Sequence, residues 1–90
     1  MEITIYSQKN CNPCSEMKSK LEEQGVPYQE IMVGAGRGAE LEHKKNYAQL
    51  IKQGSRVTPT LFVDGEIKVI GYGEGQVEEV DAVIKSFKEQ

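Results

Sequence analysis

The sequence predicts an α/β fold with a four-stranded mixed sheet, the element order β-α-β-α-β-β-α, and helices on both faces of the sheet. Three observations support this prediction. Four short segments have the apolar pattern of strands, and three longer segments carry apolar residues at helical spacing. Asp64-Gly65 separates the last two strand segments and is a typical hairpin turn. The first two strand segments are instead separated by a helical segment, which predicts a parallel pair.

The first half of the chain is predicted to form a strand–helix–strand unit. Residues 2–6 have the pattern of a buried strand, residues 15–24 that of a helix, and residues 26–33 that of a second strand. Gly25 is well placed to end the helix in a left-handed cap. The apolar face of this helix is expected to carry Cys14, Met17 and Leu21, which fall at i, i+3 and i+7.

The second half begins with a glycine-rich connector at residues 34–38, followed by a predicted helix at 39–53. Its apolar stripe is expected to contain Leu41, Ala48 and Ile51, with Tyr47 and Leu50 beside it. Strands are predicted at 60–63 and 66–70, followed by a tight turn at 71–75. The last helix is predicted at 76–88, with a buried face formed by Val77, Val80, Ile84 and Phe87.

Composition limits the class of protein. The 90 residues predict one domain, residues 1–90, and we expect a monomer. The net charge is −3 and no basic block exists, which argues against nucleic-acid binding. No apolar run approaches the ~20 residues of a membrane span. Met1 is followed directly by Glu2 and a strand rather than by an apolar leader, so we expect a cytoplasmic protein without membrane partners.

The strongest functional signal is Cys11-Asn12-Pro13-Cys14, which contains the only two cysteines of the chain. A Cys-x-x-Cys pair at a strand-to-helix junction predicts a redox dithiol. The start of the helix and the nearby Lys9 should lower the pKa of the Cys11 thiol from its usual ~8.5. Cys11 is therefore the predicted attacking thiol. Cys14, on the buried stripe, is the predicted resolving thiol.

Metal binding is the alternative reading of the two cysteines. A closed zinc site needs four ligands, and only His43 remains as a usual soft ligand. His43 lies between Glu42 and Lys44 and is predicted on a solvated helix face. The sequence therefore predicts no metal site within one chain, while an iron–sulfur cluster shared between two chains remains an alternative. The loop at 34–38 is predicted to be a plain connector, with Arg37 as a candidate ligand for a partner's carboxylate.

The chain resembles the glutaredoxins and the NrdH-type redoxins, which have the thioredoxin fold. The resemblance covers almost the whole chain. It is carried by Ile3-Thr4-Ile5-Tyr6 leading into the dithiol, Val57-Thr58-Pro59 before a strand, the Asp64-Gly65 hairpin, and Gly71-Tyr72-Gly73 before the last helix.

This resemblance implies a thiol–disulfide oxidoreductase that alternates between a dithiol and a Cys11–Cys14 disulfide. It implies a cis Pro59 beside the dithiol, in place of a trans proline that merely starts an edge strand, and a Thr58 backbone that pairs with substrate. Asn12 and Pro13 would tune the dithiol. The substrate or glutathione groove would be formed by Lys9, Thr58, Pro59, Gly71, Tyr72, Gly73 and Glu74.

The resemblance also implies the partners. Glutathione is the expected co-substrate, protein disulfides are the expected clients, and no cofactor is expected to stay bound. In the NrdH-type alternative, a flavoprotein reductase supplies electrons and ribonucleotide reductase is the client; Gly71-Tyr72 resembles the Ser-Gly-Phe region of those redoxins. Two departures separate the chain from the usual glutaredoxin pattern. The proline stands third in the dithiol motif, and Gly73-Glu74-Gly75 replaces the Cys-Asp-Asp of glutaredoxins. Lys9, Gln53 or Arg56 would hold a glycyl carboxylate, and Tyr6 lies near the dithiol or in the core.

Overall fold

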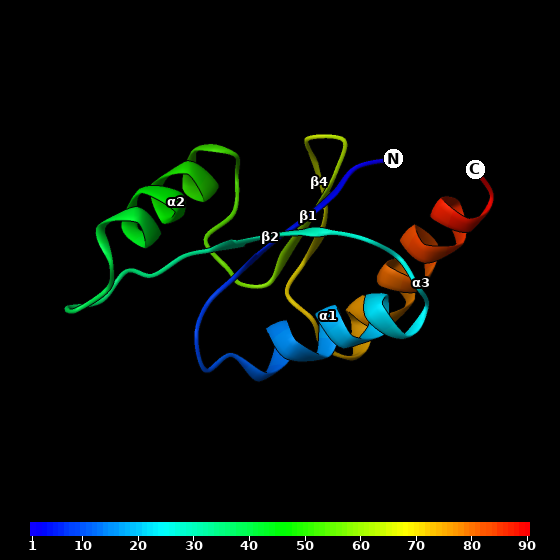
Figure 1. Cartoon of the computed structure of the whole chain (residues 1–90), viewed down its shortest axis with the longest axis horizontal. Coiled ribbons are helices and arrows are strands. Elements are labelled where there is room, and N and C mark those ends of the chain that lie inside the picture. Colours follow the sequence, from blue (N-terminus) through cyan, green and yellow to red (C-terminus); the bar gives the residue numbers. More distant parts are fainter.

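The computed structural model describes residues 1–90 and confirms the predicted order of elements (Figure 1). The elements are β1 (Ile3–Ser7), α1 (Asn12–Glu23), β2 (Gln29–Met32), α2 (Leu41–Lys52), β3 (Thr60–Val63), β4 (Glu66–Ile70) and α3 (Glu74–Lys88). No helix is both long and apolar enough to cross a lipid bilayer.

The four strands form one sheet in the order β2-β1-β3-β4. β1 and β2 are parallel, as predicted, whereas β3 is antiparallel to both β1 and β4. Asp64 and Gly65 both have positive φ, 51° and 84°, which is the backbone required at the two central positions of a type I′ hairpin turn. Because β1 and β2 are parallel, the loops that follow them leave the sheet at the same edge.

The sheet separates two hydrophobic clusters. The larger lies on the face covered by α1 and α3, and the smaller on the face covered by α2 (Figure 1). The larger cluster contains Ile3, Ile5, Met17, Leu21, Val26, Leu61, Val63, Val69, Val80 and Ile84. The smaller contains Tyr6, Val33, Leu50 and Phe62. Ile5 and Tyr6 point to opposite faces, as successive residues of a strand must.

The C-terminal end of α1 explains where the first helix stops. Gly25 has φ +70°, and its N–H donates to Glu22 O at 3.1 Å. The N–H of Val26 reaches back to Leu21 O at 2.9 Å, which completes a Schellman motif. Leu21 and Val26 are both buried in the larger cluster, as this motif favours. The predicted glycine cap is confirmed, but Val26 closes the helix instead of opening β2, which starts at Gln29.

The predicted apolar stripe of α2 is wrong for Leu41 and Ala48, whereas Ile51 is half-buried. Leu41 is 69% exposed and Ala48 is also exposed, whereas Leu50 is the one fully buried residue of this helix. Polar groups share the inward face with Leu50. Asn46 Nδ2 donates to Met32 O at 2.9 Å, and Tyr47 Oη donates to Arg56 O at 3.2 Å. These hydrogen bonds hold the inward face of α2 to the sheet and the loop. The spacing of apolar residues alone therefore did not identify this face.

The last helix begins earlier than predicted. Gly73 is the N-cap of α3, so Glu74 and Gly75 belong to the helix rather than to a turn. The N–H of Gly73 donates to Gln76 Oε1 at 2.9 Å, which is the backward half of a capping box. The predicted buried face is confirmed, because Val80 and Ile84 are buried and Val77 and Phe87 are half-buried.

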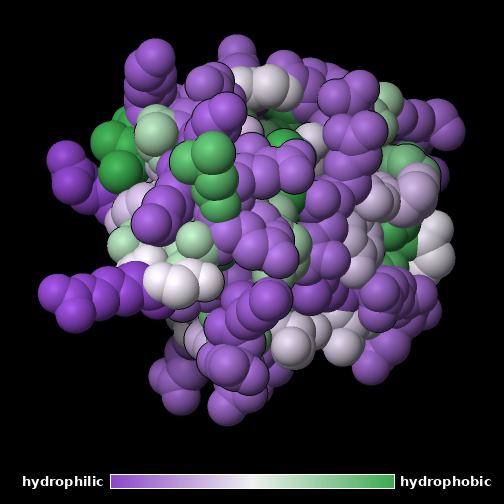
Figure 2. Space-filling model, turned by 60° about the vertical axis from the view of Figure 1, so that its left-hand side comes forward, coloured by the Kyte–Doolittle hydropathy of each residue, from purple (hydrophilic) through white to green (hydrophobic).

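The face shown in Figure 2 is mostly hydrophilic, with small and separate hydrophobic areas.

Candidate active site

Cys11 and Cys14 form a disulfide at the N-terminus of α1, with their Cα atoms 5.3 Å apart. Cys11 is the N-cap of the helix and has extended backbone angles, φ −112° and ψ 104°. Its Sγ accepts a hydrogen bond from the N–H of Cys14 at 3.2 Å, and its carbonyl accepts one from Ser15 at 3.1 Å. A side-chain acceptor for a free N–H of the first turn is what an N-cap supplies.

The two sulfurs differ in accessibility. Cys11 is half-buried, whereas Cys14 is only 1% exposed. Cys14 faces the sheet because it shares the inward side of α1 with the buried Met17 and Leu21. Asn12 and Pro13 form the exposed first turn between the two cysteines. Proline fits there because the first-turn N–H groups have no partner within the helix.

The loop before Cys11 turns sharply into the helix. Asn10 has φ +56°, a left-handed conformation that asparagine tolerates better than most residues. Lys9 is exposed in this loop and forms no ion pair. Gln8 points toward the loop before β3, where its Oε1 accepts a hydrogen bond from Thr58 Oγ1 at 3.0 Å.

The loop before β3 therefore lies beside the dithiol loop. The Thr58–Pro59 peptide bond is cis, as predicted. Pro59 O accepts a hydrogen bond from the N–H of Gly71 at 2.7 Å, which brings the start of the segment before α3 to the same place. The N–H and carbonyl of Thr58 make no hydrogen bond within the chain. They are free to pair with an extended segment of another molecule.

Two buried hydroxyl groups shape this loop and were not singled out from the sequence. Ser55 and Thr60 are 4% and 0% exposed, and their Oγ and Oγ1 atoms lie 2.8 Å apart. Both hydroxyls also reach Val57 O, and Ser55 Oγ accepts from Val57 N at 3.3 Å. Burial of these groups is tolerated because each has a partner. The sequence offered one signal for this arrangement, namely a serine and a threonine on either side of the segment that contains Thr58-Pro59.

Tyr72 is half-buried, packs against the larger cluster and faces α1. With Ser15, Glu16 and other α1 residues it lines a groove of about 410 Å³. Gly73 and Glu74 are exposed at the N-terminus of α3. The structure thus brings Thr58, Pro59 and Gly71 together, and it sets Tyr72 against the helix that carries the cysteines.

Other candidate residues lie elsewhere. Tyr6 packs against Phe62 on the α2 face, with ring centroids 5.2 Å apart, and its Oη accepts from Gln53 Nε2 at 2.9 Å. Tyr6 is therefore a core residue, and the Gln53 amide is used within the protein. Arg56 lines a separate hollow with Val57 and Ile70.

His43 does not lie on a solvated face, contrary to the prediction. Its side chain is 17% exposed, and its Nε2 lies 3.1 Å from Glu40 Oε2. It faces the loop at 34–38 because α2 is rotated relative to the predicted stripe. The structure brings together no group of three or more histidine, cysteine, aspartate or glutamate side chains.

An ion pair lies one helical turn behind Cys14. Lys18 Nζ is 2.6 Å from Glu30 Oε2 and bridges α1 to β2, and the same carboxylate accepts a hydrogen bond from the buried Ser7 hydroxyl. The hydrogen bond from Lys18, and then that from Ser7, lower the pKa of Glu30. The pair was not predicted because it depends on how α1 lies across the parallel strands.

A further pKa shift lies at the far end of α1. Burial, followed by the hydrogen bond from its hydroxyl to Glu22 Oε1 at 2.8 Å, raises the pKa of Tyr28 to about 12. The phenol therefore stays protonated at neutral pH and acts as a donor that holds the end of α1 to the segment before β2.

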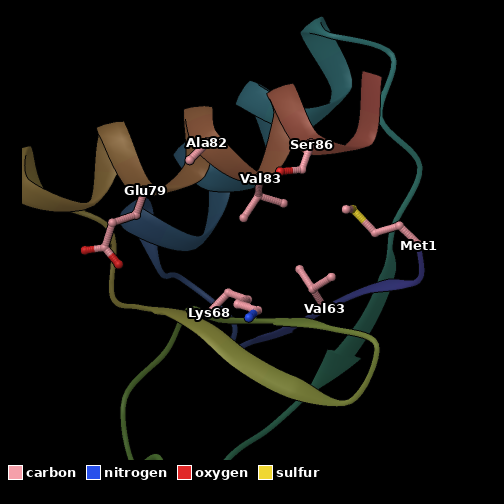
Figure 3. A pocket seen from close by; sticks show the side chains of 7 residues that line it. All are labelled: Met1, Val63, Lys68, Glu79, Ala82, Val83 and Ser86. Carbon is pink, nitrogen blue, oxygen red and sulfur yellow. The ribbon is translucent and has the colours of Figure 1, made fainter. Parts of the chain in front are cut away.

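A hollow of about 360 Å³ lies between α3 and the β3–β4 hairpin (Figure 3). Met1, Val63 and Val83 form part of its wall, and Lys68 and Glu79 stand at its sides. None of the residues that surround the dithiol contributes to it. This hollow is not part of the candidate active site.

Comparison with known proteins agrees with this geometry. A glutaredoxin family model matches residues 3–68. The chain is 36% identical to the gene 56 protein of Mycobacterium phage D29 over 87% of this chain and 80% of that protein. It is 30% identical to the N-acetyl-S-hydroxy-L-cysteine reductase of Bacillus subtilis over 93% of this chain and 84% of that protein.

A solved structure of buckwheat glutaredoxin in complex with glutathione has the same fold, with a TM-score of 0.63 and 23% identity. The alignment covers 97% of this chain and 68% of the buckwheat protein. The fold is therefore thioredoxin-like. The family match, the reductase relative and the Cys11–Cys14 disulfide at a helix N-terminus agree on one conclusion: the chain belongs to the glutaredoxin family and is a thiol–disulfide oxidoreductase.

Proposed function

We propose that this chain reduces disulfides in proteins and mixed disulfides with glutathione, using Cys11 as the attacking thiol and Cys14 as the resolving thiol. The observation that supports this division of roles is the difference between the two sulfurs. Cys11 is half-exposed and caps the helix, whereas Cys14 is buried. An incoming disulfide can reach only the first, and the hydrogen bond from Cys14 N–H favours the thiolate form of Cys11.

The proposed reaction transfers two electrons in two exchange steps. The Cys11 thiolate attacks one sulfur of the substrate disulfide, and the other sulfur leaves as a thiolate that takes up a proton. Cys14 then loses its proton and attacks Cys11 Sγ, which releases the second substrate thiol. The protein is left with the Cys11–Cys14 disulfide seen in the structure. Two electrons from an external thiol or reductase restore the dithiol.

The residues around the dithiol are proposed to position the substrate. The free N–H and carbonyl of Thr58 would pair with the substrate backbone like an added strand. Pro59 and Gly71, joined by a hydrogen bond, would form the floor beside Thr58, and Tyr72 would form one wall. At the start of α3, Gly73 and Glu74 would hold the γ-glutamyl end of glutathione.

Three residues next to the cysteines are proposed to tune the dithiol. Asn12 and Pro13 set the geometry of the four-residue ring that closes when the disulfide forms. Lys9 places a positive charge two residues before Cys11, where it would favour the thiolate. We expect these roles to change the reactivity of Cys11 more than the stability of the protein, because all three side chains are exposed.

The reductant divides the proposal into two versions. In the first, glutathione reduces the disulfide. In the second, a thioredoxin-reductase-like flavoprotein does so, and ribonucleotide reductase is the client. The segment before α3 favours the second version, because it offers one carboxylate, Glu74, where glutaredoxins offer two. In both versions the protein acts as a cytoplasmic monomer.

The Bacillus subtilis relative adds a class of substrate to be tested. Its name describes reduction of a cysteine derivative that bears an S-hydroxy group. The same two cysteines would reduce such a sulfenic acid. The Cys11 thiolate would displace hydroxide to give a mixed disulfide, and Cys14 would then release the thiol. Such a substrate belongs in the assay beside the disulfides.

The decisive experiment combines two variants with two reductants. We expect Cys11→Ser to abolish reduction of a glutathionylated peptide and Cys14→Ser to accumulate a mixed disulfide with Cys11, detected by intact mass. Full activity of Cys11→Ser would show that the attacking thiol is wrongly assigned. Wild-type turnover with glutathione and its reductase is then compared with turnover with the flavoprotein, which identifies the version that applies.

A further inference from the structure

One side-chain hydrogen bond joins the loop before the dithiol to the loop before β3. Thr58 Oγ1 donates to Gln8 Oε1 at 3.0 Å, across fifty positions of the chain. Gln8 stands three residues before Cys11, and Thr58 carries the free backbone groups proposed to pair with substrate. The bond therefore connects the segment that leads to the attacking sulfur with the segment that would hold the substrate backbone.

The register of the sheet explains why these two residues meet. β1 and β3 are antiparallel, and the last pair at this end is Tyr6 with Thr60. Continuing this register by two residues places Gln8 opposite Thr58. The residue between Thr58 and Thr60 is Pro59, which has no N–H, so the ladder of backbone hydrogen bonds cannot continue through it. Beyond the proline, the two side chains form the link that the two backbones do not.

The residues on either side of Thr58 are held by other bonds. Val57 is bonded to the two buried hydroxyl groups described above, and Pro59 O accepts from the N–H of Gly71 at 2.7 Å. These bonds tie the loop to its own half of the chain. Among the anchors of this loop, only the bond to Gln8 reaches the loop that carries the dithiol.

The Gln8 side chain has no other polar partner. It is exposed, and its Nε2 forms no hydrogen bond within the chain. Gln8 also lines a cavity of about 590 Å³, together with Lys9, Asn10 and the connector that carries Arg37, and Thr58 is not part of this lining. Open space therefore adjoins the Gln8 side chain. Its bond to the Thr58 hydroxyl is the polar contact that restrains it.

We propose that Gln8 is a positioning residue, which acts through the Thr58 hydroxyl to fix the substrate-pairing backbone relative to Cys11 and so favours disulfides that belong to a peptide. The inference rests on the proposed function and adds a determinant of substrate class. A disulfide without a peptide backbone cannot pair with the N–H and carbonyl of Thr58. Such a disulfide therefore gains nothing from the position of this loop. For a peptide, correct alignment of the reacting sulfurs lowers the barrier to exchange.

The test compares two mixed disulfides that share one leaving group. A short uncharged peptide with a single cysteine, blocked at both ends, and mercaptoethanol are each joined to thionitrobenzoate. The Cys11 thiolate of the reduced protein forms a disulfide with the peptide or mercaptoethanol sulfur, and coloured thionitrobenzoate leaves with the electron pair of the broken bond. The readout is the ratio of the two second-order rate constants, peptide over mercaptoethanol, measured by absorbance in a single turnover without external reductant.

The variants remove either side of the bond. Thr58→Val removes the donor and keeps the size of the side chain, whereas Gln8→Leu removes the acceptor. We expect each to lower the ratio about threefold to tenfold, as loss of one hydrogen bond that aligns the substrate should. Thr58→Ser keeps the hydroxyl and should keep the wild-type ratio. Gln8→Leu combined with Thr58→Val should lose no more than either variant alone, because the two side chains share one bond.

Tyr28→Phe is the matched control, because it removes a side-chain hydrogen bond to Glu22 at the far end of α1. It should leave both rate constants unchanged. A wild-type ratio in Thr58→Val or in Gln8→Leu overturns the proposal. A fall in Thr58→Ser equal to that in Thr58→Val also overturns it, as does a double variant whose loss is the product of the two single losses.

Failure of this inference is distinguishable from failure of the proposed function. If wild type releases thionitrobenzoate from neither disulfide faster than Cys11→Ser does, the proposed function is wrong. If both disulfides react through Cys11 and the ratio is the same in wild type and Gln8→Leu, the function stands and Gln8 has no positioning role. Urea unfolding of Gln8→Leu should resemble that of wild type, because the Gln8 side chain is exposed.

Discussion

Replacing Cys11 by serine or by alanine separates its chemical task from its structural one. Cys11 Sγ accepts a hydrogen bond from Cys14 N–H at 3.2 Å and so caps α1. Serine keeps a side-chain acceptor at this position, whereas alanine removes it. Loss of an N-cap acceptor costs about 1 kcal/mol. We therefore expect both variants to be inactive, but Cys11→Ala to be less stable than Cys11→Ser by about that amount.

The comparison is made in a Cys14→Ser background, so that no disulfide contributes to the free energy of unfolding. The donor is the backbone N–H of residue 14, so this background keeps the hydrogen bond that is being measured. Urea unfolding at fixed pH gives the difference directly. In thermal unfolding, a difference of 1 kcal/mol corresponds to a shift of roughly 4–8 °C for a domain of this size.

Equal stability of the serine and alanine variants would refute the reasoning. It would show that the hydrogen bond to the N-cap contributes nothing, and the argument that the same bond favours the Cys11 thiolate would lose its basis. A matched control is Asn12→Ala, which changes the exposed residue next to the cap without removing the acceptor. Its effect on stability should stay within about 0.5 kcal/mol.

Three further predictions concern the scaffold. Because the pKa of Glu30 is lowered, its pairing with Lys18 stabilises the fold at neutral pH and is lost as the pH falls through the folded-state pKa. Glu30→Gln should therefore have a lower free energy of unfolding than wild type near pH 7, and urea titrations should show a smaller loss of that free energy as the pH falls. A loss toward acid equal to that of wild type contradicts this. Leu50→Ala should lower the free energy of unfolding by about 2–5 kcal/mol, because the Leu50 side chain is fully buried. A loss under about 1 kcal/mol in urea unfolding would show that the packing of α2 does not depend on this side chain. Gly71→Ala should cost about 1–2 kcal/mol because φ is +80° and the N–H must still reach Pro59 O; thermal unfolding equal to wild type would argue against this constraint.

Features set by neighbouring residues in the chain could be predicted from the sequence. Gly25 ends α1 because the Schellman motif, in which Val26 N–H donates to Leu21 O, needs a residue with left-handed backbone angles between the helix and Val26. Asp64-Gly65 forms the hairpin because both residues accept positive φ. The placement of Cys11 at the mouth of α1 and of Cys14 on its buried side follows from helical spacing alone.

Features that depend on contacts across the fold could not be predicted. The inward face of α2 is held by Asn46 and Tyr47 through hydrogen bonds to distant backbone groups, so its hydrophobic pattern was misleading. The contact between Thr58 and Gln8 spans fifty positions of the chain and exists only once β3 lies beside β1. The cavity beside Lys9 and Arg37 requires both loops to be placed before it exists.

The unequal division of the core between the two faces of the sheet has a consequence for motion. α1 and α3 share the larger cluster, whereas α2 is anchored by a single fully buried leucine. Amide hydrogens of α2 should therefore exchange with solvent through partial opening, at a lower free energy than those of α1. The helix that carries the cysteines would stay seated on the sheet throughout such an opening.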